Sequence, residues 1–350
     1  MESKLIIIGA GLSGLTTAYF LSKQGFKDFL VLEGRDIVGG RILTKNSIDF
    51  GATWFQNHHT ELNHLLSELG LEKFPQYDAG KSILVYNTMA PAHYFESSGA
   101  PTAFRMVDGS QALPKKLASF FESKIHFEQK VQAIHKAGDR IMVETGEKTY
   151  WAEKVICTLP PKLAYCLDFE PKLSENLTSA MTNTHTWMSN AIKIGMTFAT
   201  PFWREKGFSG TVIGQVGPVI ELYDHCDHKN KSYALMGFVN EGLRDVTAEQ
   251  RKERILSYLE NFLGKEIREH TSYEEKDWSI DRMSSCENLK SVYMSPQYGN
   301  PIFERWHLDG HLLFSGTETS PRYGGYLDGA VYSGERAAQQ LLVESQEQQL

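Results

Sequence analysis

The chain contains 350 residues, of which 41% are hydrophobic and 23% charged, as in ordinary globular proteins, and this length predicts about two domains. Its formal charge of -7 argues against a nucleic-acid-binding surface. We expect a cytoplasmic protein without a membrane-spanning or anchoring segment. The four scattered cysteines form no C-x-x-C pair, so the sequence indicates neither a disulfide framework nor a zinc site.

A strand–helix–strand unit is predicted at the N-terminus. The apolar run Leu5–Ile8 is typical of a buried strand, Leu15–Leu21 of a helix after a glycine turn, and Phe29–Leu32 of a second strand. Gly25 is expected to end the helix. The chain therefore begins with a βαβ unit.

The next predicted helix has leucines at the i, i+3, i+4, i+7 spacing that places them on one face. Thr60 is expected to cap this helix and Gly70 to end it. Residues 75–101 mix glycine, proline, serine and aromatic residues, so we expect irregular structure or a crossing between domains there. Leu113–Phe121 is predicted to be helical.

Several later segments have the short apolar or alternating pattern of strands. They are Ile125–Ile134, Ile141–Thr145, Lys154–Thr158, Ala191–Phe198, Val219–Tyr223, Tyr233–Phe238 and Leu312–Ser315. Pro160 and Pro161 would end the Lys154 strand, because proline cannot donate to a strand ladder. The Val219 and Tyr233 segments would pair as a hairpin, so a second sheet is expected.

Two helices are predicted in the second half of the chain. Thr247 and Gln250 form a T-x-x-Q capping box before an apolar helical pattern that Gly264 closes. A closing helix is expected at Ala330–Leu342.

The glycines Gly9, Gly11 and Gly14 follow the first strand and open the first helix. In this G-x-G-x-x-G pattern the first glycine makes the turn, the second lets the backbone approach a pyrophosphate, and the third lets helix and strand pack closely. The phosphate would lie at the positive end of the helix, where Leu12 and Ser13 are also predicted cofactor contacts.

Glu33 follows at the end of the second strand. An acidic side chain at this point accepts hydrogen bonds from both ribose hydroxyls, which favours an adenosine without a 2′-phosphate. A glycine turn without a ligand is the alternative, and this context disfavours it.

A nicotinamide enzyme and a flavin enzyme share these features, and the next residues favour the flavin. Gly34-Arg35 and Gly39-Gly40-Arg41 provide close-approach glycines and two guanidinium groups that can bind phosphate or ribose. At this point the chain resembles the flavin-containing amine oxidases, the family of monoamine, polyamine and spermine oxidases and of flavin-type histone lysine demethylases.

A second block near the C-terminus carries the same resemblance: Phe314–Thr319, Gly324–Ala330 and Gly334–Ala338. The resemblance implies that this block returns to FAD, with Glu318 near the ribityl–phosphate part. It also implies that the helix after Gly329 points its N-terminus at the pyrimidine end of the ring, where a reduced flavin carries negative charge. The implied FAD contacts of this block are Gly316, Glu318, Gly325, Tyr326 and Ala330.

The resemblance implies further roles between the two blocks. Val131 would contact the adenine, Lys193 would hold a water against flavin N5, and Trp278 would pack beside the flavin. Lys193 on a surface strand and Trp278 as ordinary core packing are the alternatives. The pocket near the flavin would be lined by Gly51, Ala52 and Thr53.

Substrate contacts are also implied. Tyr326 resembles one wall of an aromatic cage that guides the amine, and Trp54 is assigned to substrate. An aromatic face attracts a cation, while an apolar cavity favours the neutral amine that reacts. The predicted catalytic residues are Lys193, Tyr326 and Trp278, and the predicted substrate contacts are Trp54, Tyr323 and Tyr326.

Three features depart from the family. Family members carry a longer helical insert where this chain has residues 75–105, so we expect a reduced roof and a site that is open or covered by another subunit. Cys286 lies one residue short of the cysteine of covalently flavinylated members, and Glu287 replaces their cage tyrosine, so we expect non-covalent FAD. Tyr323 or Trp54 would then form the second cage wall. We see no arginine placed to hold a carboxylate, which favours a plain amine over an amino acid.

Two histidine-containing segments were weighed as sites. Asp224–His228 has zinc-ligand residue types, but its place between two strands and before Lys-Asn-Lys favours the polar tip of a hairpin. His58, His59 and His64 are expected in a solvated helix start, unless one of them contacts substrate beyond Trp54. No metal is predicted.

The fold is predicted to be α/β: a doubly wound, Rossmann-like FAD domain of the glutathione-reductase type, with an inserted mixed-sheet α+β substrate domain. The FAD domain would comprise residues 1–75, 106–182 and 281–345, and the substrate domain residues 76–105 and 183–280. The expected reaction oxidises a small amine, with O2 as acceptor and hydrogen peroxide as product, and a homo-oligomer is compatible with it. A flavin-dependent C–C desaturase and a non-catalytic FAD-binding protein are the alternatives.

Overall fold

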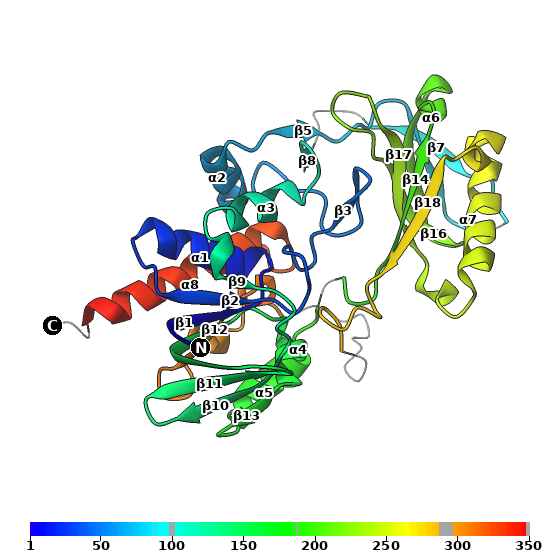
Figure 1. Ribbon diagram of the computed structural model, residues 1–350. Coiled ribbons are helices and arrows are strands. Elements are labelled where there is room, and N and C mark those ends of the chain that lie inside the picture. Colours follow the sequence, from blue (N-terminus) through cyan, green and yellow to red (C-terminus); the bar gives the residue numbers. More distant parts are fainter. Residues whose placement is uncertain (88, 98–101, 187, 287–296, 348–350) are drawn as a thin grey trace.

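Two large β-sheets with separate hydrophobic cores form the computed structural model (Figure 1). It describes residues 1–350 except 88, 98–101, 187, 287–296 and 348–350, and the side chains of 345–347 are not described. Over the described residues, none of the helices combines the length and the apolar content that a membrane span needs.

The first sheet is parallel at its centre, with the strand order β13-β10-β11-β12-β1-β2-β9, and β19 also pairs with β12. Its strands are β1 (Glu2–Ile8), β2 (Phe29–Leu32), β9 (Ile125–His126), β10 (Val131–Ala137), β11 (Arg140–Thr145), β12 (Thr149–Cys157), β13 (Asp168–Glu170) and β19 (Leu312–Phe314). In β1, Ile8 lies opposite Leu32 on one side and Cys157 on the other. A strand paired and covered on both sides needs the continuous apolar run that Leu5–Ile8 provides.

Helices cover both faces of this sheet. Leu5 and Ile7 pack with α1 and α8 on one face, whereas Ile6 and Ile8 pack in a second core that includes Leu177 of α5. The helices around this sheet are α1 (Leu12–Lys23), α2 (Thr60–Leu69), α3 (Ala112–Ala118), α4 (Pro161–Tyr165), α5 (Glu175–Asn183) and α8 (Leu327–Glu347). Figure 1 shows α1 and α8 side by side, so the first and last helices of the chain share one layer.

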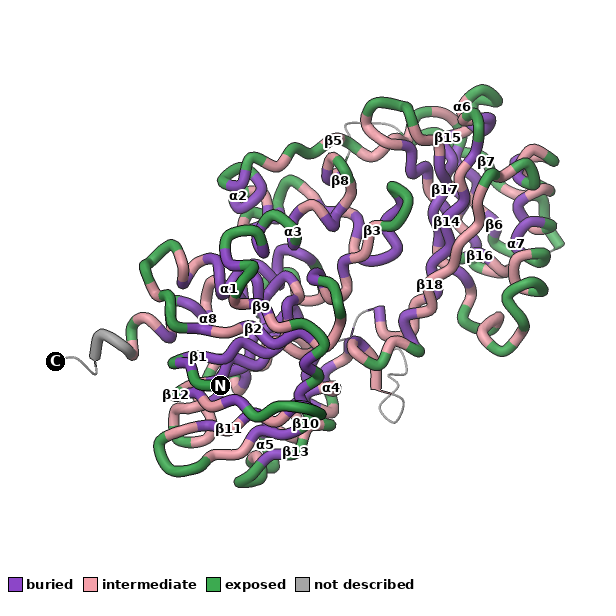
Figure 2. Tube along the Cα trace, viewed as in Figure 1, coloured by how far each residue is buried: buried purple, intermediate pink, exposed green. Residues whose placement is uncertain are grey.

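The second sheet has the order β18-β14-β17-β16-β15-β6-β7 and is mostly antiparallel. Its strands are β6 (Lys81–Val85), β7 (His93–Glu96), β14 (Ile192–Phe198), β15 (Phe208–Gly214), β16 (Val219–Asp224), β17 (Tyr233–Val239) and β18 (Ser272–Asp277). Helix α7 (Ala248–Leu263) covers the face that points away from the first sheet, and the short α6 (Phe202–Glu205) precedes β15 (Figure 1). Figure 2 shows that β14 and β17 are buried, as expected for central strands.

Short elements join the two sheets. They are β3 (Thr44–Lys45) paired with β4 (Ile48–Asp49), and β5 (Lys73–Pro75) paired with β8 (Phe104–Met106). The 3-10 turns belong to the individual sheets: η1 (Glu122–Lys124), η5 (Pro301–Glu304) and η6 (Thr317–Thr319) to the first, and η2 (Glu241–Leu243) and η3 (Lys265–Arg268) to the second. A small core of Ile48 and Phe50 with Ala234 and Met236 packs the segment after β3 onto the second sheet. This segment therefore lies between the two sheets.

Most predicted elements are confirmed. The N-terminal βαβ unit forms, although α1 already begins at Leu12. The hairpin β16–β17 forms, and the capping box of Thr247 and Gln250 is present at the start of α7. The closing helix begins at Leu327, three residues before the predicted start.

Other predictions were wrong. Thr60 is the first residue of α2 rather than its cap, which is His59. The predicted strand Ile125–Ile134 is two strands: β9 is an edge strand of the first sheet, and β10 is the second strand from the opposite edge. Within 75–101, irregular structure was wrong for β6 and β7, which are regular strands because they pair with distant β15 and with each other, although the chain does pass to the second sheet in this region.

The proposed polar hairpin tip at Asp224–His228 was also wrong in part. Asp224, His225 and Cys226 are buried, because Trp203 Nε1 and Arg204 donate to the Asp224 carboxylate and these groups satisfy it inside the protein. Only the end of the segment reaches the turn between β16 and β17. Among the described residues, no group of His, Cys, Asp and Glu side chains is arranged to hold a metal ion.

Candidate active site

A cavity of about 340 Å³ lies at the carboxyl ends of β1 and β2 and extends to the start of α8. In a doubly wound sheet this edge is where ligands bind. The predicted residues that line the cavity are Gly9, Gly11, Leu12, Ser13, Glu33, Gly34, Arg35, Gly40, Arg41, Ala52, Val131, Gly316, Gly325, Tyr326 and Ala330. The predicted residues outside its lining are Gly14, Gly51, Thr53, Trp54, Lys193, Trp278, Glu318 and Tyr323.

The glycine turn leaves room for a phosphate. Gly9 has a φ of 102°, which favours glycine, and a Cβ on Gly40 would lie 3.1 Å from Gly11 Cα. A Cβ on Gly14 would lie 2.1 Å from Gly9 O, so this glycine lets α1 pack against the turn. Gly11 is the N-cap of α1 and has no side chain to cap it. The first N–H groups of the helix therefore remain for an anion at the cavity.

Glu33 is buried and lines the cavity, as does Val131. Its Oε2 accepts a hydrogen bond from Ala10 N at 2.8 Å and its Oε1 accepts one from Arg35 N at 2.9 Å. Burial raises the pKa of Glu33, although these N–H groups act in the opposite direction. The fixed carboxylate is placed to accept bonds from ribose hydroxyls.

The two predicted arginines are held by protein carboxylates. Arg35 Nη2 donates to Asp281 Oδ1 and to Ser284 Oγ, both at 2.7 Å. Arg41 donates from Nη1 to Glu318 Oε1 at 2.5 Å and from Nη2 to Glu318 Oε2 at 3.0 Å. Burial acts to lower the pKa of Arg41, but the fully buried Glu318 raises it above its ordinary value. Arg41 therefore remains cationic and both arginines are fixed at the cavity wall, and the cavity with the uncapped start of α1 fits an anionic dinucleotide such as FAD.

Lys193 is 1% exposed, on β14. Its Nζ donates to Asp49 O at 3.0 Å, Gly51 O at 2.8 Å and Thr53 Oγ1 at 3.0 Å. Burial lowers the pKa of Lys193 to about 7, and Asp49 opposes this change. The three acceptors match the three N–H bonds of an ammonium, and Lys193 is a buried residue rather than a surface one.

The predicted tryptophans lie on the same side of the cavity. Trp278 is 1% exposed and its Nε1 donates to Phe50 O at 2.7 Å. Trp54 Nε1 donates to Gln76 Oε1 at 2.7 Å, and its ring meets that of Tyr223 at 4.8 Å. The Nζ atom of Lys193 lies 5.5 Å from the centre of the Trp54 ring. Lys193 and Trp278 therefore both bind residues 49–53, and Trp54 follows directly in the chain.

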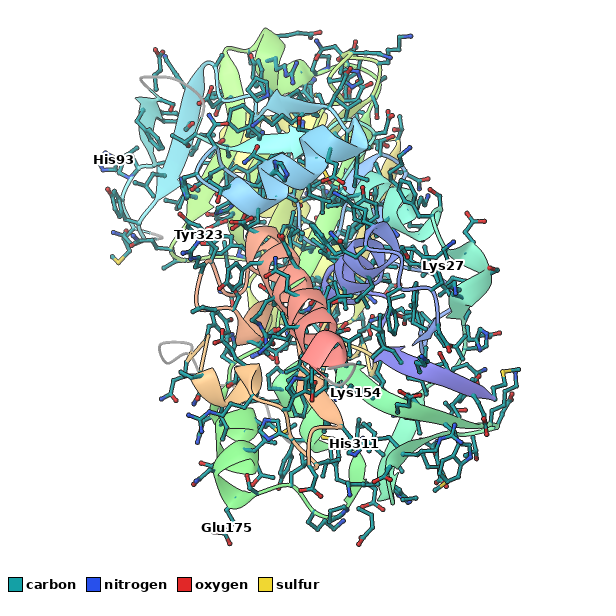
Figure 3. The ribbon with its side chains drawn as sticks, turned by 90° about the vertical axis from the view of Figure 1, so that its left-hand side faces the viewer. Lys27, His93, Lys154, Glu175, His311 and Tyr323 are labelled. Carbon is teal, nitrogen blue, oxygen red and sulfur yellow. The ribbon has the colours of Figure 1, made fainter. Side chains whose placement is uncertain are left out.

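An aromatic cluster lies at the end of the cavity where α8 begins. Tyr326 lines the cavity and is 57% exposed. His59 contacts its ring at a centroid distance of 5.2 Å and the ring of Tyr323 at 4.8 Å. Figure 3 shows Tyr323 beside the N-terminal end of α8, below α2. Three aromatic rings from two distant segments thus form one wall.

His59 is a site residue for which the sequence predicted a solvated helix start. His58 and His64 are exposed, but His59 is buried. Burial and the neighbouring His58 lower the pKa of His59 to about 4, so its ring is neutral at physiological pH. The only sequence signal was its nearness to Trp54.

The cavity lining also contains residues that the sequence did not identify, among them Gln129 and Met283. Gln129 is buried, and its Oε1 accepts hydrogen bonds from Thr145 Oγ1 at 3.1 Å and Tyr150 OH at 3.0 Å. Met283 lines the cavity near Gly34. Glu287, at the expected position of a cage tyrosine, lies outside the described residues.

The family model described as flavin containing amine oxidoreductase matches residues 12–94 and 84–342. The two matches meet at residues 84–94, inside the region that we expected to be shorter than in family members. Of the described residues in 76–105, none is helical. The helical substrate region of the family is therefore reduced in this chain.

Curated relatives are similar over nearly the whole chain. Flavin-containing amine oxidase B of Cavia porcellus is 24% identical over 459 residues, covering 98% of this chain and 87% of that protein. Flavin-containing amine oxidase A of Equus caballus is 25% identical over 453 residues, covering 97% and 84%. These alignments are longer than the chain of 350 residues, so the relatives contain insertions that it lacks.

Solved structures share the fold. A putrescine oxidase with bound putrescine has a TM-score of 0.86 at 22% identity, covering 98% of this chain and 99% of that chain. Cyclohexylamine oxidase from Brevibacterium oxydans has a TM-score of 0.86 at 20% identity, covering 99% and 100%. Together with the family match over most of the sequence, these findings show that the chain belongs to the flavin-containing amine oxidoreductases.

Proposed function

We propose that this FAD-dependent amine oxidase removes a hydride from the α-carbon of a small, plain amine and produces an imine. The observation that carries the proposal is the aromatic wall at the cavity, where Tyr326 contacts His59 and His59 contacts Tyr323. Aromatic faces attract a protonated amine on approach, whereas an apolar surface favours its neutral form. Neutral His59 adds no positive charge that would repel an ammonium group.

The chain's own residues bind and orient the reactants. Glu33 would hold the ribose of FAD, the start of α1 its pyrophosphate, and Arg41 with Glu318 its ribityl–phosphate part. Lys193 donates its three N–H bonds to Asp49 O, Gly51 O and Thr53 Oγ1, so none is left to hold a water near flavin N5; instead Lys193 and Trp278 would fix the backbone of residues 49–53 beside the flavin. Positioning of this kind is the protein's share of flavin chemistry.

When bound, FAD would accept the hydride at N5 and pass two electrons to O2, which gives hydrogen peroxide. The imine takes up water and releases an aldehyde or ketone. The second product is ammonia for a primary amine and a smaller amine for a secondary one. We propose that FAD is held without a covalent bond and that residues 1–75, 106–182 and 281–345 form its domain. Residues 76–105 and 183–280 would form the substrate domain.

Anaerobic mixing of the purified holoenzyme with monoamines, diamines, polyamines and amino acids tests the proposal. We expect one amine class to bleach the visible flavin absorbance, and air to restore it with release of peroxide. Tyr326→Ala should slow the bleaching without loss of bound FAD. The control is Tyr94→Ala, at an exposed position of β7, which should bleach at the wild-type rate. If no amine bleaches a correctly bound flavin, the proposed reaction is wrong.

A further inference from the structure

Two cysteines that are far apart in the sequence meet beside the cavity. Cys166 follows α4, and Cys286 follows β18 after a turn at residues 278–285. Their Sγ atoms lie 2.8 Å apart, although 120 positions separate the residues in the chain. Both are free thiols in the structure. The sequence spacing gave no sign of this pair.

The pair lies in the wall between the cofactor cavity and the surface. Cys166 lines the cavity together with Leu163 and Ser284. Cys286 lines a small adjoining cavity of about 10 Å³, which Lys162 and Leu163 also line. The pair thus joins the α4 side of the wall to the 282–286 side.

The two thiols are placed where an oxidant can reach them. Cys166 is exposed and Cys286 is partly exposed, whereas Cys157 and Cys226 are buried. Burial also raises the pKa of Cys157 and of Cys226 to about 12, which keeps both as unreactive thiols. The chain therefore contains one accessible pair and two internal controls.

We propose that Cys166 and Cys286 are a modification site at which a peroxide forms an intramolecular disulfide. This inference goes beyond the proposed function, because the peroxide need not come from amine oxidation. One peroxide takes two electrons from the two thiols, and the products are one S–S bond and two molecules of water.

Each bond in the reaction is accounted for. The Cys286 sulfur attacks one peroxide oxygen, the O–O bond breaks, and the leaving oxygen departs as water, which leaves a sulfenic acid on Cys286. Lys162 and Cys286 line the same small cavity, which places a basic side chain beside the attacking sulfur. The Cys166 sulfur then attacks the Cys286 sulfur, the S–O bond breaks, and the second water departs.

The order in which the two cysteines react follows from their surroundings. Partial burial and the neighbouring Cys286 raise the pKa of Cys166 to about 12, so Cys166 remains a thiol at neutral pH. Such a thiol is a poor nucleophile towards a peroxide, whereas its contact with Cys286 at 2.8 Å places it to attack a sulfenic acid formed on that residue. Cys286 is therefore oxidised first and Cys166 second.

The disulfide would close one wall of the cofactor cavity. It joins α4 to the segment that contains Arg282, Met283 and Ser284, all three of which line that cavity. FAD must pass this wall or a neighbouring one when it dissociates. We expect the oxidised protein to release FAD several-fold more slowly, and Cys286 in the disulfide to be unavailable for a bond to the flavin.

The test treats the full-length holoenzyme with hydrogen peroxide and maps its peptides by mass spectrometry without reduction. We expect a Cys166–Cys286 crosslinked peptide with two fewer hydrogen atoms, which a thiol reductant reverses, while Cys157 and Cys226 remain thiols. Cys166→Ser should trap a sulfenic acid on Cys286 that reacts with dimedone. Ser285→Ala, a neighbouring substitution that keeps both thiols, should crosslink like the wild type.

FAD release, followed by the recovery of flavin fluorescence, provides the second measurement. We expect the slower release in the oxidised wild type and its absence in Cys166→Ser and Cys286→Ser. The proposal is overturned if both thiols remain free after peroxide, if Cys286 is found bonded to the flavin, or if release is unchanged in fully crosslinked protein. These measurements need no amine, so their failure is separate from failure of the amine oxidase reaction.

Discussion

Replacing Lys193 with methionine tests whether this buried amine carries a lowered pKa in the folded state. Lys193 is 1% exposed, and burial lowers its pKa from the ordinary 10.5 to about 7. The unfolded chain therefore binds more protons than the folded one between these values, and the stability of the folded state rises with pH in this window. At about 1.4 kcal/mol per pH unit, the whole window is worth about 5 kcal/mol.

Part of that window is accessible to measurement. Between pH 7 and pH 9, the folded state goes from about half to almost complete loss of the Lys193 proton, while the unfolded state keeps it. We expect the free energy of unfolding of the wild type to gain about 2 kcal/mol more over this interval than that of Lys193→Met. Urea unfolding of the holoenzyme at fixed FAD concentration measures the two gains.

Lys27→Met is the matched control, because Lys27 is exposed (Figure 3). It should show the pH dependence of the wild type. The same gain in Lys193→Met and in the wild type would refute the reasoning, because Lys193 would then not carry a lowered pKa in the folded state.

Two further substitutions test the packing around the cavity. Glu318→Gln leaves the partly buried Arg41 without its carboxylate, and we expect the free energy of unfolding to fall by about 3 kcal/mol and less FAD to be bound. Thermal unfolding and flavin content measure the two effects, and an unchanged melting temperature would contradict the prediction. Gly334→Ala would place a Cβ 2.5 Å from Ser13 O between α8 and α1, and we expect a loss of about 1–3 kcal/mol in urea unfolding. The control Gly146→Ala, whose Cβ would meet nothing closer than 3.5 Å, should have little effect, and equal losses would contradict the close approach.

Local patterns predicted the elements that local forces determine. The run Leu5–Ile8 is apolar because β1 is covered on both faces, and the capping box of α7 uses only residues within one turn. Strand β7 gave no such signal, because His93–Glu96 is exposed throughout and is ordered by pairing with β6. Strand β6 in turn pairs with β15, which lies more than a hundred residues later. Long-range pairing of this kind cannot be read from periodicity.

The same division applies to the site. The glycines and Glu33 were predicted because a pyrophosphate and a ribose each require a particular residue type at a fixed position in a βαβ unit. His59 was not, because its setting depends on Tyr323 and Tyr326, which follow more than 260 positions later. Asp224 was taken for a surface residue, because nothing in the sequence shows that Trp203 and Arg204 satisfy its charge inside the protein.

The position of Lys193 and Trp278 outside the cavity lining has a structural reason. Three buried side chains, one within β14 and two just after strands of the second sheet, bind the backbone of one short segment. Lys193 of β14 donates to the carbonyls of residues 49 and 51, and Trp278 after β18 donates to that of Phe50. His225 after β16 accepts at Nε2 from Asp49 N at 3.1 Å. The next residue, Ala52, lines the cavity. The second sheet is therefore connected to the cofactor cavity through this backbone. Hydrogen bonds from the second sheet fix the carbonyls of residues 49–51, and this also fixes the backbone that lines the cavity. A change at Lys193 would accordingly move the cavity wall as well as remove a charge.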